Sequence, residues 1–157
     1  MKPQFTRSSL SRYRQSIFKP KNPHKYKGDP TKIFARSSWE SKLLRRLDLD
    51  PHVIQYSCEE VVIPYVSPVD GRTHRYFVDA WVKIKRPDGR IVEMLLEVKP
   101  RSQTVEPKRT PGKKKDRFLQ EVLEYGINTA KWNSATAYAK KKGWEFHILT
   151  EEHLGIK

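Results

Sequence analysis

The chain has 157 residues, about the length of one domain, and 32 lysines and arginines against 18 acidic residues give it a formal charge of +14. No stretch approaches the ~18 apolar residues of a membrane span, and the N-terminus lacks the apolar core of a signal peptide. Cys58 is the single cysteine, which excludes an internal disulfide and a zinc site built from several cysteines. We therefore expect a protein that stays inside a cell and binds a polyanion.

Two segments carry most of the positive charge. Residues 1–30 hold eight lysines and arginines against one acidic residue, and residues 100–115 hold six against one. Neither segment has hydrophobic periodicity, which predicts a basic arm over 1–30 and a domain over 31–157 that carries a basic loop at 100–115. Double-stranded DNA is the expected partner, and a solubilising tail or an arm for a protein partner is the alternative. The candidate nucleic-acid-binding residues are Lys25, Lys27, Arg36, Arg101, Lys108, Arg109, Lys113, Lys114 and Lys115.

The segment 31–157 predicts alternating helices and strands. Apolar residues recur at helical spacing from Ser37 to Asp48, and extended runs follow over 60–66, 73–85 and 90–99. Turn sequences separate these runs, which indicates a three-stranded antiparallel meander. Beyond the basic loop we expect helices over 116–125 and 129–142, a strand over 144–149 and a short final turn. The predicted order is α-β-β-β-α-α-β.

The sequence Arg86-Pro87-Asp88-Gly89-Arg90 predicts a three-residue turn with a bulge, which pairs Arg86 with Arg90. In this register Ala80 lies opposite Leu96, and one face of the hairpin is uniformly apolar. A two-residue turn would shift the pairing and move core residues to the wrong side. The three-residue turn is therefore the prediction.

The same register places Asp79 opposite Glu97 on the other face, with Lys99 two residues further on. Like charges opposite each other are destabilising, and a divalent cation would compensate them. Carboxylate and carbonyl oxygens suit Mg²⁺ or Mn²⁺, so Asp79, Glu97 and the carbonyl of Val98 are the predicted metal ligands. The alternative is a surface ion pair with a nearby lysine. Glu40 starts on the core-facing side of the first helix, where it is either a capping-box residue or part of the site.

Glu on a helix, Asp on a strand and Glu-x-Lys on the next strand resemble the PD-(D/E)-x-K nuclease superfamily, at Glu40, Asp79 and Glu97-Val98-Lys99. From about residue 25 to the C-terminus, further segments resemble the head completion nucleases of T4-like tailed phages. These segments are Lys25-Tyr26-Lys27-Gly28-Asp29-Pro30, Arg36-Ser37-Ser38-Trp39-Glu40, Val62-Ile63-Pro64-Tyr65, Arg75-Tyr76-Phe77-Val78-Asp79 and Asn128-Thr129-Ala130-Lys131-Trp132.

The resemblance implies an α/β fold with a restriction-endonuclease-like core, in which helices flank a mixed sheet. It implies a divalent-metal-dependent DNA endonuclease with Glu40, Asp79, Glu97 and Lys99 as catalytic residues and Mg²⁺ or Mn²⁺ as cofactor. It also implies a late phage protein that acts on the DNA-filled head in the host cytoplasm or the virion, with portal or neck proteins as further partners. A structural head or neck protein without catalysis and an endonuclease subunit of a mobile element remain the alternatives.

Overall fold

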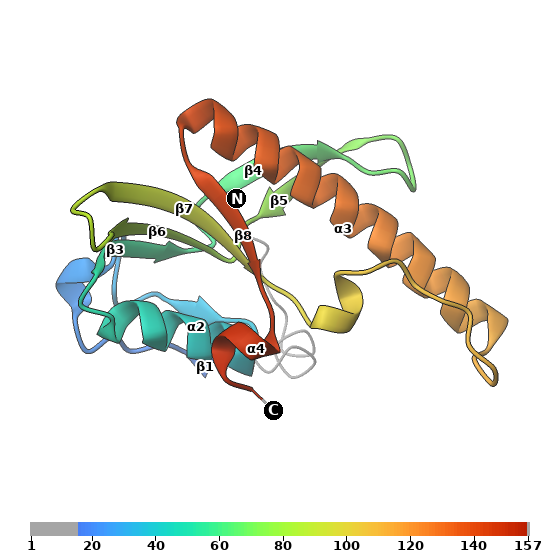
Figure 1. Cartoon of the computed structure of the whole chain (residues 1–157), viewed down its shortest axis with the longest axis horizontal. Coiled ribbons are helices and arrows are strands. Elements are labelled where there is room, and N and C mark those ends of the chain that lie inside the picture. Colours follow the sequence, from blue (N-terminus) through green and yellow to red (C-terminus); the bar gives the residue numbers. More distant parts are fainter. Residues whose placement is uncertain (1–15, 157) are drawn as a thin grey trace.

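A four-stranded mixed sheet forms the centre of the computed structural model, which describes residues 16–156 (Figure 1). Its strands are β3 (Val53–Cys58), β6 (Ala80–Lys85), β7 (Ile91–Val98) and β8 (Glu145–Leu149), in the order β3-β6-β7-β8. β3, β6 and β7 pair antiparallel, whereas β8 pairs parallel to β7. A parallel pair needs a crossover connection, which here contains the long helix α3 (Lys115–Lys142).

One face of the sheet packs against α2 (Ser38–Leu49) and the short C-terminal helix α4 (Glu151–Leu154) (Figure 1). The Ser37 side chain caps the start of α2 by accepting a hydrogen bond from the Glu40 amide. Apolar residues of α2 at helical spacing are buried against the sheet, as the sequence predicts. This core contains Leu43, Leu44, Leu47, Val53, Tyr56, Ala80, Val82, Leu96 and Leu154. The packing of α2 on the sheet fixes the position of Glu40, because Glu40 lies in the first turn of this helix.

The other face packs against α3 and a separate two-stranded ribbon, β4 (Val62–Val66) with β5 (Thr73–Phe77). Its core contains Ile63, Tyr65, Tyr76, Val78, Trp81, Leu95, Ala135 and Ala139. The buried residues of α3 lie in its second half, whereas Leu119, Val122 and Leu123 in its first half are exposed. The first half of α3 therefore projects beyond the sheet, and these three apolar residues are not part of the core.

Residues 16–35 pack on the body of the domain. β1 (Ser16–Ile17) pairs with β2 (Phe34–Ala35), and the short 3₁₀ helix η1 (Pro23–Lys25) leads into Tyr26, which is buried against Tyr56. Residues 16–30 therefore do not form a separate arm. The rest of the arm that the charge predicts, residues 1–15, lies outside the described residues.

The β6–β7 register is confirmed, with Ala80 opposite Leu96 and the Arg86 amide bonded to the Arg90 carbonyl at 2.8 Å. The predicted strand over 73–85 is wrong, because it divides at Val78-Asp79 into β5 and β6, which belong to different sheets. Consequently Asp79 precedes the ladder and does not pair with Glu97 within it.

Two further elements differ from the sequence analysis. The predicted helices over 116–125 and 129–142 form one helix, in which the Thr129 hydroxyl donates to the Tyr125 carbonyl at 2.8 Å and does not cap a new helix. β3 has no counterpart among the predicted strands, because a register shift between Val53 and Gln55 breaks its alternation. Over the described residues, no helix is both long and apolar enough to cross a membrane.

Candidate functional site

A pocket of about 580 Å³ lies where the start of α2, the β5–β6 junction and the end of β7 meet. Glu40 reaches it from α2, Asp79 from the junction, Glu97 from β7 and Lys99 from the residue after Val98. The structure therefore brings the four predicted catalytic residues to one place. The lining comprises Arg36, Ser37, Ser38, Trp39, Glu40, Arg75, Tyr76, Phe77, Asp79, Glu97, Val98, Lys99, Pro100 and Lys131.

Asp79 is bound to the strand across from it through its side chain. Its Oδ2 accepts a hydrogen bond from the Val98 amide at 2.7 Å, and its own carbonyl accepts one from the Glu59 amide at 3.2 Å. Burial raises the pKa of the Asp79 carboxyl above its ordinary value, whereas the Val98 amide and then Glu40 act in the opposite direction. The hydrogen bond to Val98 orients the carboxylate beside Glu97 although the two residues are not paired in the ladder.

Glu97 is buried, with 7% of its surface exposed. Its Oε2 accepts a hydrogen bond from the Tyr76 hydroxyl. Burial, followed by the nearby Asp79 carboxylate, raises the pKa of Glu97 well above its ordinary value, and Tyr76, Lys99 and Lys131 oppose this shift. Two acids that are both shifted towards the protonated form by burial, with the charge of Asp79 acting on Glu97, form a candidate site for a cation.

Glu40 combines both roles that its sequence position allows. Its Oε2 accepts a hydrogen bond from the Arg36 amide at 2.8 Å, which is a cap on the start of α2, and its carboxyl also hydrogen-bonds Asp79. Burial and the Asp79 charge raise the pKa of Glu40 to about 9. Burial and the Asp79 charge therefore favour the protonated form of Glu40, which can donate a hydrogen bond to Asp79.

A further acidic residue, Glu59, lies close to Glu40. Glu59 is buried, adopts a positive φ of 54° and forms an ion pair with Arg36 Nε at 2.9 Å. Ligand atoms of Glu40, Cys58 and Glu59 lie within 4.8 Å of one another. The ion pair with Arg36 balances the charge of Glu59, so the acids around Asp79 remain the stronger candidate for a metal centre.

Lysines complete the wall of the pocket. The Lys99 amide donates to the Leu149 carbonyl of β8 at 2.9 Å, which anchors the residue at the sheet edge. Lys131 enters from α3, with its Nζ 5.5 Å from the centre of the Tyr76 ring. Burial lowers the pKa of Lys131, and the Glu97 charge opposes this shift. The site therefore presents carboxylates and ammonium groups side by side.

The predicted nucleic-acid-binding residues divide into two groups. Arg36 lines the pocket, and Lys27, Arg101, Lys108, Arg109, Lys114 and Lys115 are exposed. Lys25 is buried, and its Nζ donates to the carbonyls of Leu47, Asp48 and Asp50 at 3.0, 2.9 and 2.8 Å. Because its ammonium caps the end of α2, Lys25 is not available to DNA and its predicted role is corrected.

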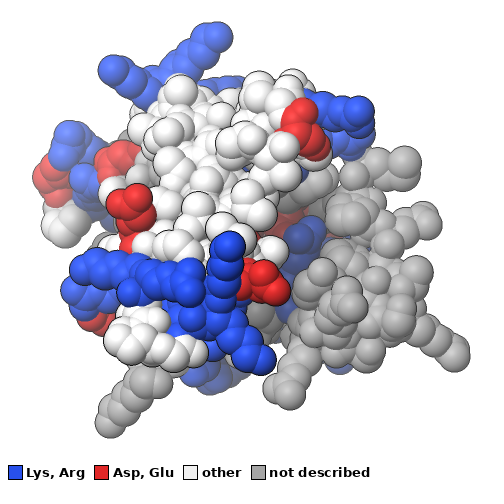
Figure 2. Space-filling model, turned by 90° about the vertical axis from the view of Figure 1, so that its right-hand side faces the viewer, with Lys and Arg blue, Asp and Glu red and all other residues white. Residues whose placement is uncertain are grey.

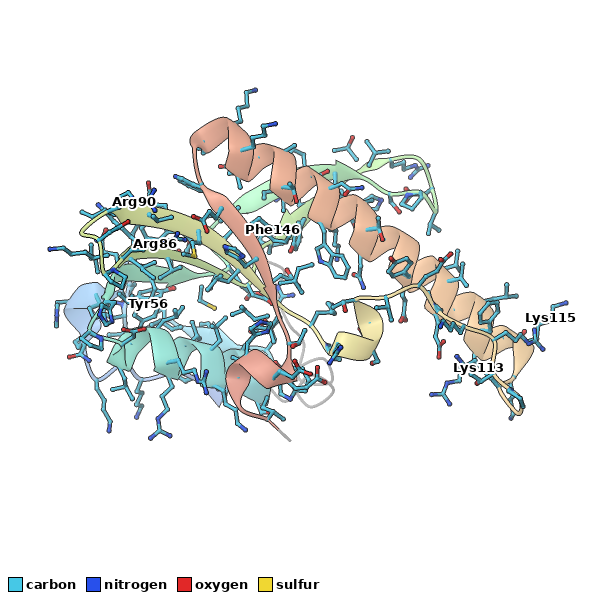
Figure 3. The ribbon with its side chains drawn as sticks, in the orientation of Figure 1. Tyr56, Arg86, Arg90, Lys113, Lys115 and Phe146 are labelled. Carbon is cyan, nitrogen blue, oxygen red and sulfur yellow. The ribbon has the colours of Figure 1, made fainter. Side chains whose placement is uncertain are left out.

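Lys113 also has a role inside the protein. Its Nζ donates to the Lys108 carbonyl and to Glu121, both at 2.8 Å, so it ties the basic loop to α3. These contacts use two of the three donors of Lys113, and its predicted contact with DNA stays a prediction. Figure 3 places Lys113 and Lys115 at the far end of α3, away from the sheet. Lysine and arginine side chains gather over the lower part of the face at this end, with a few acidic side chains among them (Figure 2).

Several pocket residues were not predicted as site residues from the sequence. Tyr76 and Lys131 contact the acids through a hydrogen bond and through charge, and Arg75, Trp39 and Phe77 line the pocket. Lys131 had a detectable signal, because it lies four and eight residues before Ala135 and Ala139 on the buried stripe of α3. A lysine in such a stripe is unusual unless it serves a site.

Comparisons with known proteins identify the family of the chain. Residues 50–151 match the family model described as TnsA-like endonuclease N terminal. The head completion nuclease of Enterobacteria phage T4 is 41% identical over 138 residues, which cover 86% of this chain and 89% of that protein. The mixed sheet with flanking helices agrees with the restriction-endonuclease-like class expected from the sequence. The chain therefore belongs to a nuclease family: it carries the TnsA-like endonuclease domain and is a homologue of the T4 head completion nuclease.

Proposed function

We propose that this chain is a divalent-metal-dependent endonuclease that hydrolyses phosphodiester bonds of double-stranded DNA with little sequence specificity. Glu40, Asp79, Glu97 and Lys99 are the proposed catalytic residues. The observation that carries the proposal is that three buried or partly buried acids and a lysine, which come from separate elements, line one pocket. A protein that only held DNA would gain nothing from these acids, because they repel phosphate.

The donor set fits Mg²⁺ or Mn²⁺. Asp79 and Glu97 supply carboxylate oxygens, the Val98 carbonyl is the proposed third protein ligand, and hard cations prefer such oxygens. Burial is the main cause of the raised pKa of all three acids, and the Asp79 charge adds to it at Glu40 and Glu97. A bound cation would offset this cost of the charged forms. A bound cation would polarise the scissile phosphate and lower the pKa of a bound water.

The remaining residues act on the substrate and on the acids. Lys99 lies on the pocket wall, where its ammonium orients the attacking water or stabilises negative charge on the phosphate. Glu40 is at the start of α2 and hydrogen-bonded to Asp79, so it completes the outer shell of the ligand set or contributes to a second cation. Because the Val98 amide and Tyr76 already orient Asp79 and Glu97, the carboxylates need little rearrangement.

The exposed basic residues provide affinity without sequence readout. Lys131 in the pocket and Lys115 at the other end of α3 are 16 residues apart along the helix, about 24 Å or roughly seven base pairs. DNA that leaves the pocket along α3 would meet Lys108, Arg109 and Lys114 with its phosphates. Contacts to phosphates position DNA but do not distinguish bases, so cleavage has little sequence preference.

The relative's name gives the biological setting of the proposal. We infer that the chain acts in phage head completion, on packaged DNA, in the cytoplasm of the infected host or in the virion, with portal or neck proteins as partners. The second candidate function is a structural head or neck protein that holds the packaged DNA end. The exposed lysines and arginines at residues 101–115 favour DNA binding in either case, whereas the acids favour the enzyme.

Supercoiled plasmid incubated with the purified protein tests the proposal. We expect relaxation or linearisation with Mg²⁺ or Mn²⁺ and none with EDTA. Asp79→Ala should abolish cleavage but leave DNA binding, whereas Lys108→Ala, on the exposed loop, should mainly weaken binding and its salt dependence. Cleavage by Asp79→Ala at the wild-type rate would overturn the site, and DNA binding without any cation-dependent cleavage would favour the structural protein.

A further inference from the structure

We propose that Lys131 is a second phosphate-binding residue of this pocket, which contacts a DNA phosphate together with Lys99. The inference rests on the proposed function, and it assigns a substrate contact to the long helix α3. It implies that the strand being cut is held between the end of β7 and α3, with one ammonium group on each side.

The position of Lys131 is the first observation. Lys131 occupies the buried stripe of α3 that continues through Ala135 and Ala139, both of which are fully buried against the ribbon and the sheet. From this stripe the side chain lies partly buried in the pocket wall with Asp79, Glu97 and Lys99. A lysine on an exposed face of α3 would be an ordinary solvated charge, whereas Lys131 is partly buried and lines the pocket that holds the acids.

The second observation is that the Lys131 ammonium lacks an acceptor. Among residues 16–156, which the structure describes, no atom forms a hydrogen bond or an ion pair of 4.0 Å or less with Nζ of Lys131. The same holds for Nζ of Lys99 within this part of the chain. Lys25 and Lys113 show the contrast, because their ammonium groups have three and two acceptors from the protein. An ammonium group has three donors, so those of Lys131 are available to a ligand that enters the pocket.

Two tyrosine rings hold the ammonium in place. Nζ of Lys131 lies 5.7 Å from the centre of the Tyr65 ring and 5.5 Å from that of Tyr76. Both rings attract the cation through their faces but accept no conventional hydrogen bond there. The rings therefore set the position of Nζ and leave its donors directed to a ligand.

The missing acceptor is best supplied by phosphate. Glu97 is the acid whose charge acts most strongly on Lys131, yet the two do not form an ion pair of 4.0 Å or less. Glu97 already accepts a hydrogen bond from the Tyr76 hydroxyl. A cation bound to Asp79 and Glu97 would further weaken the attraction of these acids for Lys131. A phosphodiester bound beside that cation offers the anionic oxygens that Lys99 and Lys131 lack, and a charge-assisted hydrogen bond to phosphate is strong.

The test combines a protein change with a change in the DNA. Lys131→Met removes the charge and keeps the length of the side chain, Lys131→Arg keeps the charge, and Lys140→Met changes an exposed lysine on the same helix. The DNA is a 20-base-pair duplex in which single linkages around the mapped cut positions are replaced, one at a time, by uncharged methylphosphonates. Single-turnover cleavage is measured with Mg²⁺ and equilibrium DNA binding with Ca²⁺, after thermal unfolding has verified that each variant folds.

We expect Lys131→Met to lower cleavage or DNA affinity by about 10- to 100-fold, Lys131→Arg to retain most of it and Lys140→Met to change neither. One methylphosphonate should weaken the wild type but cause little further loss in Lys131→Met, because both changes remove the same contact. Additive losses at every linkage, or wild-type behaviour of Lys131→Met, would overturn the proposal.

The two measurements separate this proposal from the proposed function. If the wild type does not cut with any cation, the nuclease assignment fails, but the binding cycle in Ca²⁺ still decides whether Lys131 contacts a phosphate. If Lys131 were only a counter-ion of Glu97, Lys131→Met would raise the Mg²⁺ affinity of the DNA-free protein, measured by calorimetry, and the cycle would be additive. That result would also overturn the phosphate contact.

Discussion

The carboxylate of Asp79 accepts a hydrogen bond from the backbone amide of Val98 at 2.7 Å. The last residue pair of the β6–β7 ladder is Ala80 with Leu96, so Asp79 lies one residue outside the ladder. The hydrogen bond to Val98 holds Asp79 beside β7 in place of backbone pairing. It links the β5–β6 junction to the end of β7, from which Glu97 and Lys99 enter the pocket. The relative position of the acids therefore depends on a side-chain contact to the backbone.

Two substitutions of Asp79 separate its charge from its hydrogen bond. Asp79→Asn keeps an acceptor for the Val98 amide and removes charge from an acidic pocket, so we expect a melting temperature at or above that of the wild type. Asp79→Ala leaves the amide without its partner, at a cost of about 1–3 kcal/mol. Both variants should lose cleavage by about 10³-fold. Calorimetric melting and plasmid cleavage check this, and a less stable Asn variant than Ala variant would contradict it.

The acids also predict how stability depends on pH. The pKa of Glu40 is raised to about 9, so between its unfolded value near 4.5 and pH 9 the folded state binds more protons than the unfolded state. Without a divalent cation, the free energy of unfolding should therefore decrease as the pH rises through this window. Urea unfolding in EDTA at several pH values measures the slope.

Glu40→Gln is the control for this prediction, because it cannot ionise and still offers an oxygen to the Arg36 amide. The difference between wild type and Glu40→Gln isolates Glu40 from Asp79, Glu97 and Lys131, whose pKa values are also shifted. Mg²⁺ should stabilise the wild type more at pH 8 than at pH 5, since protons compete for the same oxygens. A wild-type slope equal to that of Glu40→Gln would contradict the raised pKa.

Local sequence was sufficient for those parts of the fold that depend on local chemistry. The turn at Pro87-Asp88-Gly89 determines its own geometry, with Gly89 at a φ of 87°, and the β6–β7 register follows from it. The amphipathic pattern of α2 likewise identified the face that is buried. These features placed Glu40 and Glu97 on the elements where the structure has them.

Features that depend on distant partners could not be predicted in the same way. Asp79 leaves the ladder because its carbonyl and carboxylate bind the amides of Glu59 and Val98, which no local pattern reveals. Lys25 lies in a basic segment that is typical of DNA-binding arms. Only its hydrogen bond to the Leu47 carbonyl at the end of α2, 22 residues away, shows that it caps this helix. A count of charges cannot distinguish a lysine that meets phosphate from one that meets carbonyl oxygens.

The role of Lys25 gives a prediction about stability. Lys25→Met should lower the free energy of unfolding by about 2–3 kcal/mol, because three carbonyls at the end of α2 lose a charged donor. DNA affinity of the folded variant should be unchanged at temperatures well below melting. Lys32→Met, an exposed change of the same kind, is the matched control and should leave both quantities within error. A stable Lys25→Met variant with weak DNA binding would restore the original assignment.

The basic loop gives a prediction about salt. The side chains of Lys114 and Lys115 are exposed at the start of α3, so replacing each by alanine should reduce the slope of log affinity against log salt by up to about 0.9. Lys113→Ala should instead loosen the loop, because it removes the contacts to the Lys108 carbonyl and Glu121. DNA-binding titrations over a range of NaCl concentrations, with limited proteolysis of the loop, distinguish the two effects. Equal slopes for all variants would mean that this end of the molecule does not contact DNA.

Tyr76→Phe tests whether the acids are held in place by their neighbours. The substitution keeps the ring under Lys131 and removes the hydroxyl that donates to Glu97, so Glu97 loses an orienting contact. Removal of such a partner typically lowers metal affinity by about 10- to 100-fold. We therefore expect the Mg²⁺ concentration for half-maximal cleavage to rise by about tenfold, while the rate at saturating Mg²⁺ and the DNA affinity change little. Tyr125→Phe, in the first half of α3 and outside the lining of the pocket, is the control. A variant that loses cleavage at all Mg²⁺ concentrations would indicate that the tyrosine hydroxyl acts on the substrate and not through Glu97.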